Sequence, residues 1–319
     1  MPAYILKRFL LFIPTLIIVT LLVFTLLRVI PGDPALLILI GDEGEGHYTQ
    51  EQLDNLRAKL GTDRPIYVQY GDWVWKLVRL NFGVSTFYDT PITDDLIQKV
   101  PITLELTVLA MLLATIVAVP LGVVSAIKQD TLADYAARIV TIGGIALPTF
   151  WVAILMIYFL ILVFGWLAPL GYVDLWEDPW TNLQQMIFPS IALGVHNMAF
   201  VARVTRSSML EVMRDDYIRT ARSKGLAESA VIYRHALKNA LLPVVTVSGY
   251  EFGRLIAGTV VIEVIFLVPG MGRLLIDSIF HRDYATIQAV VVVITVAVLA
   301  LNLLLDLVYA WLNPRIRYT

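Results

Sequence analysis

The segment DDYIRTARSKGLAESAVIYRHALKNALLPVV runs from Asp215 to Val245 and lies between two long apolar stretches of the chain. It is charged and rich in arginine and lysine, and its apolar residues recur at helical spacing. Charged side chains are costly inside a bilayer, so we expect this segment to lie outside it, between two membrane-spanning helices.

The whole chain is strongly apolar. Of its 319 residues, 58% are hydrophobic and only 16% are charged, whereas about a quarter of the residues in soluble domains are charged. The composition predicts an all-α integral membrane protein. A net charge of −2 provides no global field for nucleic acid, so no nucleic-acid partner is expected. The absence of cysteine excludes disulfides, thiolate metal sites and cysteine nucleophiles.

Six apolar stretches approach the length of about 20 residues that crosses a bilayer as a helix. The first follows Lys7 and Arg8, but it is too long for a signal sequence and lacks a cleavage site, so we expect it to be retained. The third is uncharged well beyond Phe164, where we end it so that GWLAPLGY (165–172) lies in the outer interface. The fifth is interrupted by Glu251 and Arg254. The predicted spans are 9–29, 102–127, 139–164, 186–202, 240–266 and 285–305.

The basic residues indicate the orientation, because cytoplasmic segments of membrane proteins carry an excess of lysine and arginine. With both termini inside, 14 of the 24 basic residues fall in inner segments, including Lys128, Arg138, Arg315, Arg317 and eight between Arg203 and Lys238. The outer 165–185 segment has none, and the long 31–100 segment is net acidic. We therefore expect a first span in 1–30, a small extracytoplasmic subdomain in 31–100, and a core domain in 101–319 with a cytoplasmic loop at 208–240.

The outer subdomain carries two recognisable patterns. Thr49, Gln52 and Gly61 have the spacing of an N-cap, a capping box and a C-terminal glycine, which predicts a helix over 49–61. Four aromatic residues follow, and we expect them to pack the subdomain and anchor it at the interface, with docking of an outer partner as the alternative. These residues are Tyr67, Tyr70, Trp73 and Trp75.

Signatures of enzymatic chemistry are missing from the sequence. No G-x-x-x-x-G-K-[ST] motif occurs, so the chain has no P-loop. Its four histidines (47, 196, 235 and 281) do not have metal-ligand spacing, and the glycine-rich stretch GDEGEG (41–46) is acidic and would repel phosphate. We therefore expect a non-enzymatic chain with no catalytic residue, metal or cofactor of its own, whose energy comes from another subunit or an ion gradient.

The opening segment predicts two helices separated by a glycine. Leu210, Met213, Tyr217 and Ala221 form one helical stripe, and Gly225 can end that helix in a left-handed conformation. A second helix fits 227–241, with Leu226, Ala230, Tyr233, Leu237 and Leu241 on one face. Val231 and Ile232 then fall among its polar residues. An interfacial hairpin on anionic lipid explains the charge, but apolar residues on a polar face favour docking into a protein groove.

The stretches YIRTARSKGL (217–226) and RHALKNALLPVV (234–245) resemble the cytoplasmic loop of ATP-binding-cassette importer permeases, in the branch that carries dipeptides, oligopeptides and nickel. The general family loop reads E-A-A, three residues, a glycine and a later Leu-Pro. Arg219, Thr220 and Ala221 occupy the E-A-A positions, so arginine replaces glutamate and threonine replaces one alanine; Gly225 is the glycine, and the proline is farther away. The resemblance extends over nearly the whole chain through PGDP (31–34), NFGVS (81–85), VPITLELT (100–107), ALPTFW (146–151), VIEVIFLVPGMGRLLIDSIFHRDY (261–284) and NPRIRY (313–318).

The resemblance implies that the loop is a coupling helix, which fits a cleft on a separate ATPase and transmits its closure to the spans. It implies an inner-membrane permease subunit with four partners: a second permease, a paralogue being favoured over an identical copy, two ATPases that bind ATP and magnesium, and an extracytoplasmic substrate-binding protein. Peptides are the favoured substrate, with nickel and oligosaccharides left open. The residues assigned to ATPase contact are Tyr217, Arg219, Thr220, Ala221, Gly225, Leu226, Val231 and Ile232.

A gradient-driven carrier or channel is the alternative of a different class. It predicts an inward-facing relay of several intramembrane acids, or inverted repeats. The sequence contains few such acids and no convincing repeat. A membrane-embedded enzyme is disfavoured because no catalytic cluster is visible.

Three further features of the fifth span are candidate sites. Gly249, Gly253 and Ala257 recur every four residues, which predicts close packing with another helix, such as the second permease. Glu251, roughly 15 Å from the cytoplasmic edge, can pair with Arg254 as a structural pair or as part of the substrate path. The turn FLVPGMGRL (266–274) is expected at the outer mouth, either as a gate or as an ordinary surface loop, with Met271 accessible from outside. The gate residues are Pro269, Gly270, Met271 and Gly272.

Overall fold

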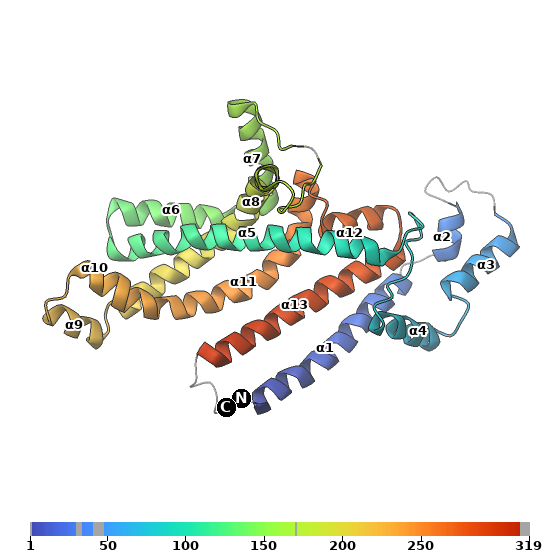
Figure 1. The fold of residues 1–319 in the computed structure, drawn as a ribbon, viewed down its shortest axis with the longest axis horizontal. Coiled ribbons are helices and arrows are strands. Elements are labelled where there is room, and N and C mark those ends of the chain that lie inside the picture. Colours follow the sequence, from blue (N-terminus) through green and yellow to red (C-terminus); the bar gives the residue numbers. More distant parts are fainter. Residues whose placement is uncertain (1, 30–33, 41–47, 170, 313–319) are drawn as a thin grey trace. The chain divides into compact units, whose positions relative to one another are not determined.

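A computed structural model describes residues 2–29, 34–40, 48–169 and 171–312, and this described chain is all-helical apart from one isolated β-bridge between Val84 and Pro91. The acidic stretch 41–46, His47, Arg315, Arg317, most of the PGDP motif and the whole NPRIRY motif lie outside the described residues. In chain order (Figure 1) the elements are α1 (Pro2–Val29), α2 (Pro34–Ile40), α3 (Gln50–Leu60), α4 (Ile66–Val78), α5 (Ile92–Ile127), α6 (Leu132–Ala146), α7 (Thr149–Phe164), α8 (Pro179–Val212), α9 (Asp216–Ser223), α10 (Glu228–Ala230), the π-helix η1 (Val231–Ala236), α11 (Leu237–Phe266), α12 (Met271–Phe280) and α13 (Tyr284–Leu312).

The chain divides into two compact units. The first unit combines Met1–Val100 with Leu274–Ala300, and the second combines Pro101–Arg273 with Leu301–Thr319. The division falls where the sequence predicts the start of the core domain, but it assigns Leu274–Ala300 to the same unit as the 31–100 segment.

In the first unit, the capped helix and part of the aromatic packing are as predicted. The Thr49 hydroxyl accepts the Gln52 backbone N–H, the Gln52 side chain accepts the Thr49 N–H, and Gly61 ends α3 with φ 70°. Tyr70 and Trp73 of α4 pack on Phe24 of α1, with ring centroids 5.3 and 5.8 Å away. The other two aromatic residues, Tyr67 and Trp75, are 75% and 58% exposed, so only half of the set packs the unit.

A buried carboxylate ties the NFGVS loop to the start of α13. Asp283 is 1% exposed and accepts hydrogen bonds from the hydroxyls of Ser85 (2.5 Å), Thr86 (3.0 Å) and Thr286 (2.7 Å). The backbone N–H groups of Thr86 and Thr286 also donate to it. Because the first N–H groups of a helix have no partner within the helix, a carboxylate at this position stabilises the N-terminus of α13.

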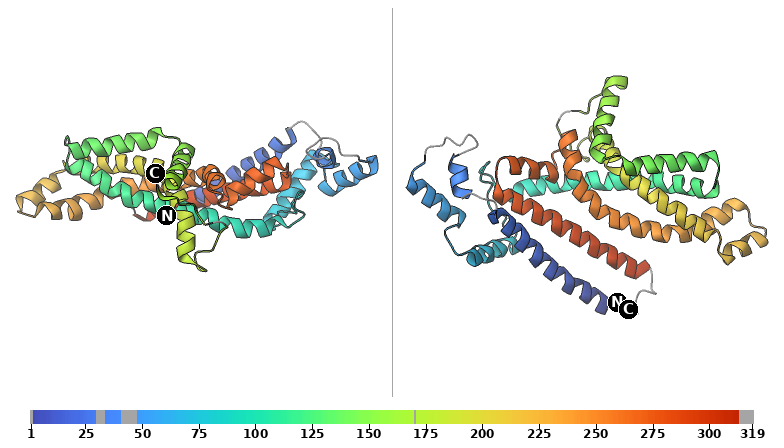
Figure 2. Two further views of the ribbon diagram at one scale, coloured as in Figure 1. Left: turned by 90° about the horizontal axis from the view of Figure 1, so that it is seen from above. Right: turned by 180° about the vertical axis from the view of Figure 1, so that it is seen from behind.

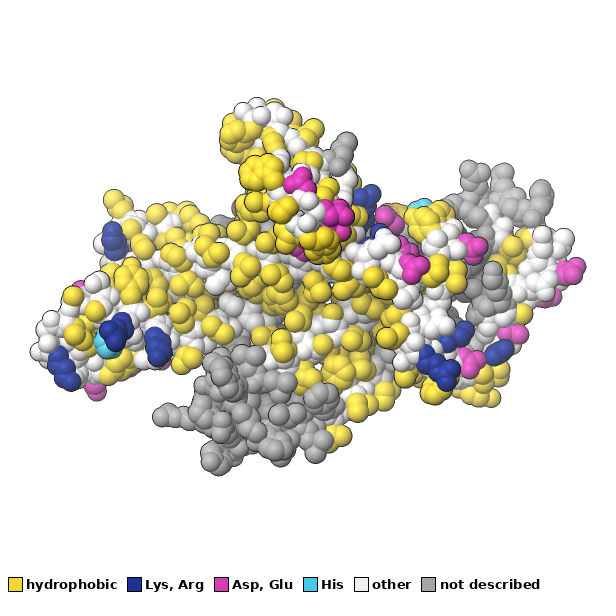
Figure 3. All heavy atoms as spheres, viewed as in Figure 1, with side chains coloured by type: hydrophobic (Ala, Val, Ile, Leu, Met, Phe, Trp, Pro, Cys, Tyr) yellow, Lys and Arg dark blue, Asp and Glu magenta, His cyan; other side chains and the backbone are white. Residues whose placement is uncertain are grey.

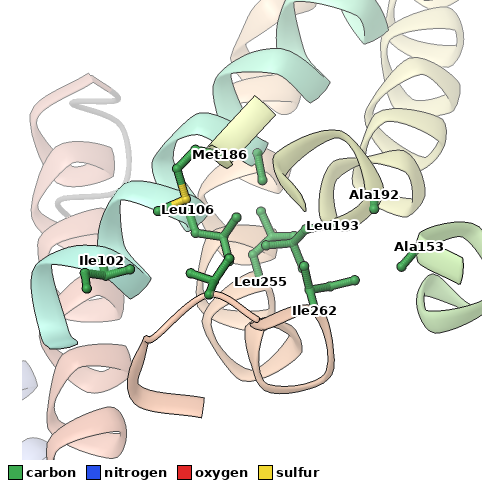
Figure 4. Close-up of a cluster of buried hydrophobic side chains, with 10 residues drawn as sticks. Ile102, Leu106, Ala153, Met186, Ala192, Leu193, Leu255 and Ile262 are labelled. Atoms are coloured by element: carbon green, nitrogen blue, oxygen red, sulfur yellow. The ribbon is translucent and has the colours of Figure 1, made fainter. Parts of the chain in front are cut away.

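The second unit is built around α8, which packs against α11, α6 and α7. The three views of Figures 1 and 2 show α8 and α11 running side by side. Side chains of α5, α8 and α11 converge in a buried apolar cluster (Figure 4) that includes Leu106, Leu193 and Leu255.

Small residues bring α5 and α8 close together. A Cβ at Gly194 would lie 2.9 Å from the Ala110 carbonyl oxygen, and one at Gly122 would lie 2.6 Å from the Ala202 carbonyl oxygen. Larger residues would therefore separate these helices, and small residues at such contacts are typical of helix packing in membranes.

Among the described residues, three helices are long and apolar enough to cross a membrane: Ile92–Ile127, Pro179–Val212 and Tyr284–Leu305. Two helix pairs separated by short breaks, Leu132–Ala146 with Thr149–Phe164 and Glu228–Phe266 with Met271–Phe280, would raise the number to five. Within α1, the stretch Leu10–Thr25 is apolar but shorter than these three helices.

The span predicted over 139–164 is not one continuous helix. The structure splits this stretch into α6 and α7, which are bent by 109°. Leu147 is extended (φ −83°, ψ 129°) before Pro148, and proline disfavours a helical conformation at the preceding residue.

The Asp283 contact generates the first testable prediction. Asp283→Asn is expected to lower the free energy of unfolding by about 3 kcal/mol, because charge-assisted bonds are lost and an amide donor would face buried donors. Thermal unfolding of the purified chain in detergent measures this change. Asp63→Asn, at an exposed position of the same unit, is the control. Equal midpoints for both variants would contradict the structural role of Asp283.

Candidate functional site

The charged loop forms a compact helical hairpin at the end of α8. The single helix predicted from the stripe between Leu210 and Ala221 is wrong: α8 ends at Val212, and α9 begins only at Asp216 after the extended Asp215. Gly225 follows α9 with φ 77°, so the predicted left-handed turn is confirmed. The chain then returns through α10 and η1 into α11, and the α9–η1 hairpin (216–236) lies at one end of the second unit (Figure 1).

The inner face of the α9–η1 hairpin differs from the prediction. Val231 and Ile232, expected on the polar face for docking, are 0% and 7% exposed. Tyr233, expected on the packed face, is 63% exposed. The reason is η1: its i→i+5 hydrogen bonds change the periodicity, so faces assigned at 3.6 residues per turn no longer apply.

The buried face seats the hairpin on two long helices. Ile218 of α9 is fully buried, as is Met209 of α8, and Ala221 is 7% exposed. These residues share one apolar cluster with Val231, Ile232, Ala236 and Ala240, and with Val123 and Ala126 at the end of α5. A force on α9 therefore acts directly on α5 and α8. Val231, Ile232 and Ala221 belong to this seat, and as buried residues they do not offer a contact surface.

The outer face of the hairpin is largely polar, and basic residues outnumber acidic ones on it. Tyr217, Arg219, Thr220, Gly225 and Leu226 are exposed, and Figure 3 shows lysine and arginine side chains gathered over this end. Two side-chain contacts hold the hairpin closed. The Arg222 guanidinium donates to Glu228 at 2.7 Å across the glycine turn and holds the pKa of Glu228 below its usual range, and Asn239 donates to the Tyr217 hydroxyl at 2.7 Å.

A buried ion pair, which the sequence analysis did not identify, lies behind the hairpin. Asp134 of α6 is fully buried and accepts two hydrogen bonds from the Arg206 guanidinium of α8, at 3.0 and 2.9 Å. The Ser125 hydroxyl of α5 and the Asp130 N–H complete its contacts. The sequence signal available was an aspartate in the first turn of an apolar helix, which usually indicates only a favourable helix terminus.

The break after α11 is organised by a second buried carboxylate. Glu263 accepts a hydrogen bond from the Thr103 hydroxyl of α5 at 2.7 Å and from the N–H groups of Gly272 and Arg273 at 2.7 and 3.1 Å. The Met271 N–H donates to the Thr103 hydroxyl at 2.8 Å. These donors are the first N–H groups of α12, which a helix leaves without internal partners.

The predicted accessibility of the 269–272 turn is wrong. Met271 is 2% exposed, and Gly270 and Gly272 are buried as well. The turn folds onto Glu263, and a Cβ at Gly270 would lie 2.5 Å from the Glu263 carboxylate. A cysteine at Met271 is therefore expected to be protected from a water-soluble reagent in this conformation, and the gating role stays a prediction.

The pair predicted within α11 is present. The Arg254 guanidinium donates to Glu251 at 3.1 Å; Glu251 is 5% and Arg254 60% exposed. Of the three small residues, Gly249 makes a close contact with another helix, and packing by all three as one stripe stays a prediction. A Cβ at Gly249 would lie 2.4 Å from Leu305 of α13, whereas Gly253 is buried and Ala257 is exposed.

The loop between α7 and α8 is held by side chains of α5 and α8. The Tyr172 hydroxyl donates to Glu105 of α5 at 2.7 Å, and burial together with this bond raises the pKa of Tyr172. Gln185 of α8 donates to the Gly171 carbonyl and accepts the Val173 N–H. These contacts fix the position of the loop. Within the described ranges no cluster of metal-ligating side chains occurs.

Comparisons with known proteins give consistent results. The family described as "Binding-protein-dependent transport system inner membrane component" matches residues 118–318, and its N-terminal counterpart, described as "Binding-prot-dependent transport system membrane comp, N-term", matches residues 1–107. A putative peptide transport system permease protein of Brucella abortus (strain 2308) is 40% identical over 318 residues, which cover 100% of both chains. The dipeptide transport system permease protein DppB of Escherichia coli (strain K12) is 38% identical over 338 residues, covering 99% of this chain and 98% of its own.

A solved structure shares the fold. An amino acid ABC transporter crystallised with histidines superposes with a TM-score of 0.53, covering 67% of this chain and 92% of its own, at 19% identity. At this identity the likeness concerns the arrangement of helices.

The contact of Gly270 with Glu263 gives the second prediction. Gly270→Ala is expected to lower the free energy of unfolding by about 1–3 kcal/mol, because the added methyl group overpacks the carboxylate site. The matched control is Gly143→Ala in α6, where a Cβ meets nothing within 4 Å, so this variant should be neutral or stabilised. Thermal unfolding in detergent compares them, and equal loss in both variants would contradict the close contact.

Proposed function

The chain belongs to the family of binding-protein-dependent transport system inner membrane components, and from this premise we propose that it is the permease subunit of an ATP-driven importer of dipeptides or longer peptides. Several similar chains are named peptide or dipeptide transport system permeases, and their similarity to this chain extends over nearly their full lengths. A peptide with charged termini needs a lined path, because a charge at the centre of a membrane helix costs about 2.5–3.5 kcal/mol on the insertion scale.

The observation that carries the proposal is the seat of the α9–η1 hairpin. Its exposed face is polar, while its buried face packs on the ends of α5 and α8. Such a hairpin is suited to receive motion from a separate ATPase and to pass it to helices of the path. The contact residues proposed on its exposed face are Tyr217, Arg219, Thr220, Gly225 and Leu226.

The assembly that we propose places this chain beside a second, paralogous permease. Two ATPases, with ATP and magnesium, bind on the cytoplasmic side, and a substrate-binding protein docks on the outer side. Six spans with both termini in the cytoplasm, in the inner membrane, fit this arrangement. Nickel and oligosaccharides are the alternative substrates.

The gradient-driven alternative is less well supported. A proton or ion relay needs carboxylates that face a shared water path. Within the described residues, Glu263 is enclosed by Thr103 and the start of α12, Glu251 pairs with Arg254, and Glu105 accepts from Tyr172. Each of these three carboxylates accepts hydrogen bonds from different donors, and none of these hydrogen bonds links one carboxylate to another.

Reconstitution tests the proposal. The chain is placed in proteoliposomes with its genomic neighbour permease, ATPases and binding protein, and uptake of a labelled dipeptide is measured. We expect uptake that requires ATP and the binding protein and that resists an ionophore. Uptake without ATP that an ionophore abolishes would favour the gradient-driven carrier.

The third prediction concerns the glycine turn. Gly225→Val should reduce ATP-dependent uptake at least tenfold, because a β-branched residue is strained at φ 77° and distorts the surface presented to the ATPase. A Cβ at this position meets nothing within 4 Å, so the effect is conformational rather than steric. Gly225→Asn, which tolerates a left-handed conformation, is the matched control. Normal uptake by the valine variant would contradict the proposal that this turn contacts the ATPase.

The fourth prediction separates the two roles open to the Glu251 and Arg254 pair. Replacing both with glutamine leaves neither charge unpaired, so assembly should persist if the pair is only structural. We expect the double variant to assemble and hydrolyse ATP with its partners, but to change its preference among dipeptides. Competition uptake assays measure that preference, and an unchanged profile would exclude the pair from the path.

A further inference from the structure

A cavity of about 270 Å³ lies between α5, α6 and α8, on the side of the second unit that leads to the hairpin. Three arginines line it, together with apolar side chains, a serine and a threonine. The lining residues that matter are Arg138, Arg203, Arg206, Leu121, Thr141 and Ile142. Gly122 also lines the cavity, and α5 and α8 approach each other closely at this residue.

Positive charge at the cavity exceeds the negative charge available to neutralise it. The fully buried Asp134 is engaged by Arg206. Within the described part of the chain, Arg138 and Arg203 make ring contacts instead, 5.7 Å from Tyr135 and 5.0 Å from Phe200, and no carboxylate pairs with them. Asp130 is exposed, and its charge acts on Arg206 rather than on Arg138 or Arg203. Two guanidinium groups therefore remain for a ligand.

The surface around the cavity is apolar. Two isoleucines of α6, Ile139 directly after Arg138 and Ile142 one helical turn later, are 71% and 65% exposed. Guanidinium groups bind phosphate through paired donors, whereas exposed isoleucines on a membrane helix are suited to acyl chains. A ligand that satisfies both features carries a phosphate and a hydrocarbon tail.

We propose that this cavity binds the phosphate of an anionic phospholipid headgroup, with Arg138 and Arg203 as its ligands and Arg206 held in place by Asp134. Basic pockets between membrane helices on the cytoplasmic side are suited to such headgroups. In the proposed orientation, Arg203 and Arg206 lie on the last turns of α8, close to the cytoplasmic loop. A bound lipid then braces α6 against α8 directly behind the seat of the α9–η1 hairpin.

The test measures lipid binding to the full-length chain in detergent by native mass spectrometry, with phosphatidylglycerol as the probe. Arg138→Gln with Arg203→Gln should weaken binding about thirtyfold, as expected for two basic residues near an anionic headgroup. Lys128→Gln with Arg214→Gln removes two exposed charges outside the cavity and should change binding less than threefold. Thr141→Trp fills the cavity while both arginines remain, and it should likewise weaken phosphatidylglycerol binding.

Two further ligands identify the source of the phosphate. Glycerol phosphate lacks the tails and diacylglycerol lacks the phosphate, and we expect neither to compete with phosphatidylglycerol. Competition by glycerol phosphate would overturn the lipid assignment in favour of a soluble phosphate ester. Equal phosphatidylglycerol binding by the wild type and both cavity variants would overturn the site. The measurement needs neither ATP nor transport, so its failure is distinguishable from failure of the proposed function.

Discussion

The carboxylate of Glu263 resolves the main structural difficulty of the second unit, which is a helix broken inside an apolar protein. Irregular backbone at membrane depth persists only where protein or water satisfies its polar groups. Glu263 accepts the N–H groups of Gly272 and Arg273, and its other oxygen is fixed by Thr103 of α5. Gly270 and Gly272 leave the space that the carboxylate occupies. The end of α11, the start of α12 and the packing of α5 therefore depend on one side chain.

Features governed by local spacing were predictable from the sequence. The capping box at Thr49 and the pair of Glu251 and Arg254 depend on neighbours three residues away. The positive φ of Gly225 follows from the same kind of local rule. Contacts between distant residues were not predictable, because nothing near Glu263 indicates Thr103, which is 160 residues away.

The largest error of prediction concerns η1 and shows how a local irregularity changes which residues a helix buries. Assigning faces at 3.6 residues per turn placed Val231 and Ile232 toward a partner. The π-helix instead turns them into the cluster with Met209, and it exposes Tyr233. Such bulges cost helix regularity and are frequent at functional sites. Here the irregularity lets one short segment seat the hairpin internally while α9 keeps an exposed face.

The polar contacts of the second unit differ in what they connect, and this difference constrains its motion. Glu263 with Thr103 joins α11 to α5, and Asp134 with Arg206 joins α6 to α8. Breaking a buried ion pair by removing one partner costs about 3–5 kcal/mol, so displacement of α9 should carry α6 and α8 together rather than separate them. Glu251 and Arg254 lie on one helix and therefore stay paired wherever α11 moves. The exposed Arg254 can then meet a different environment in each position without leaving a buried carboxylate uncompensated.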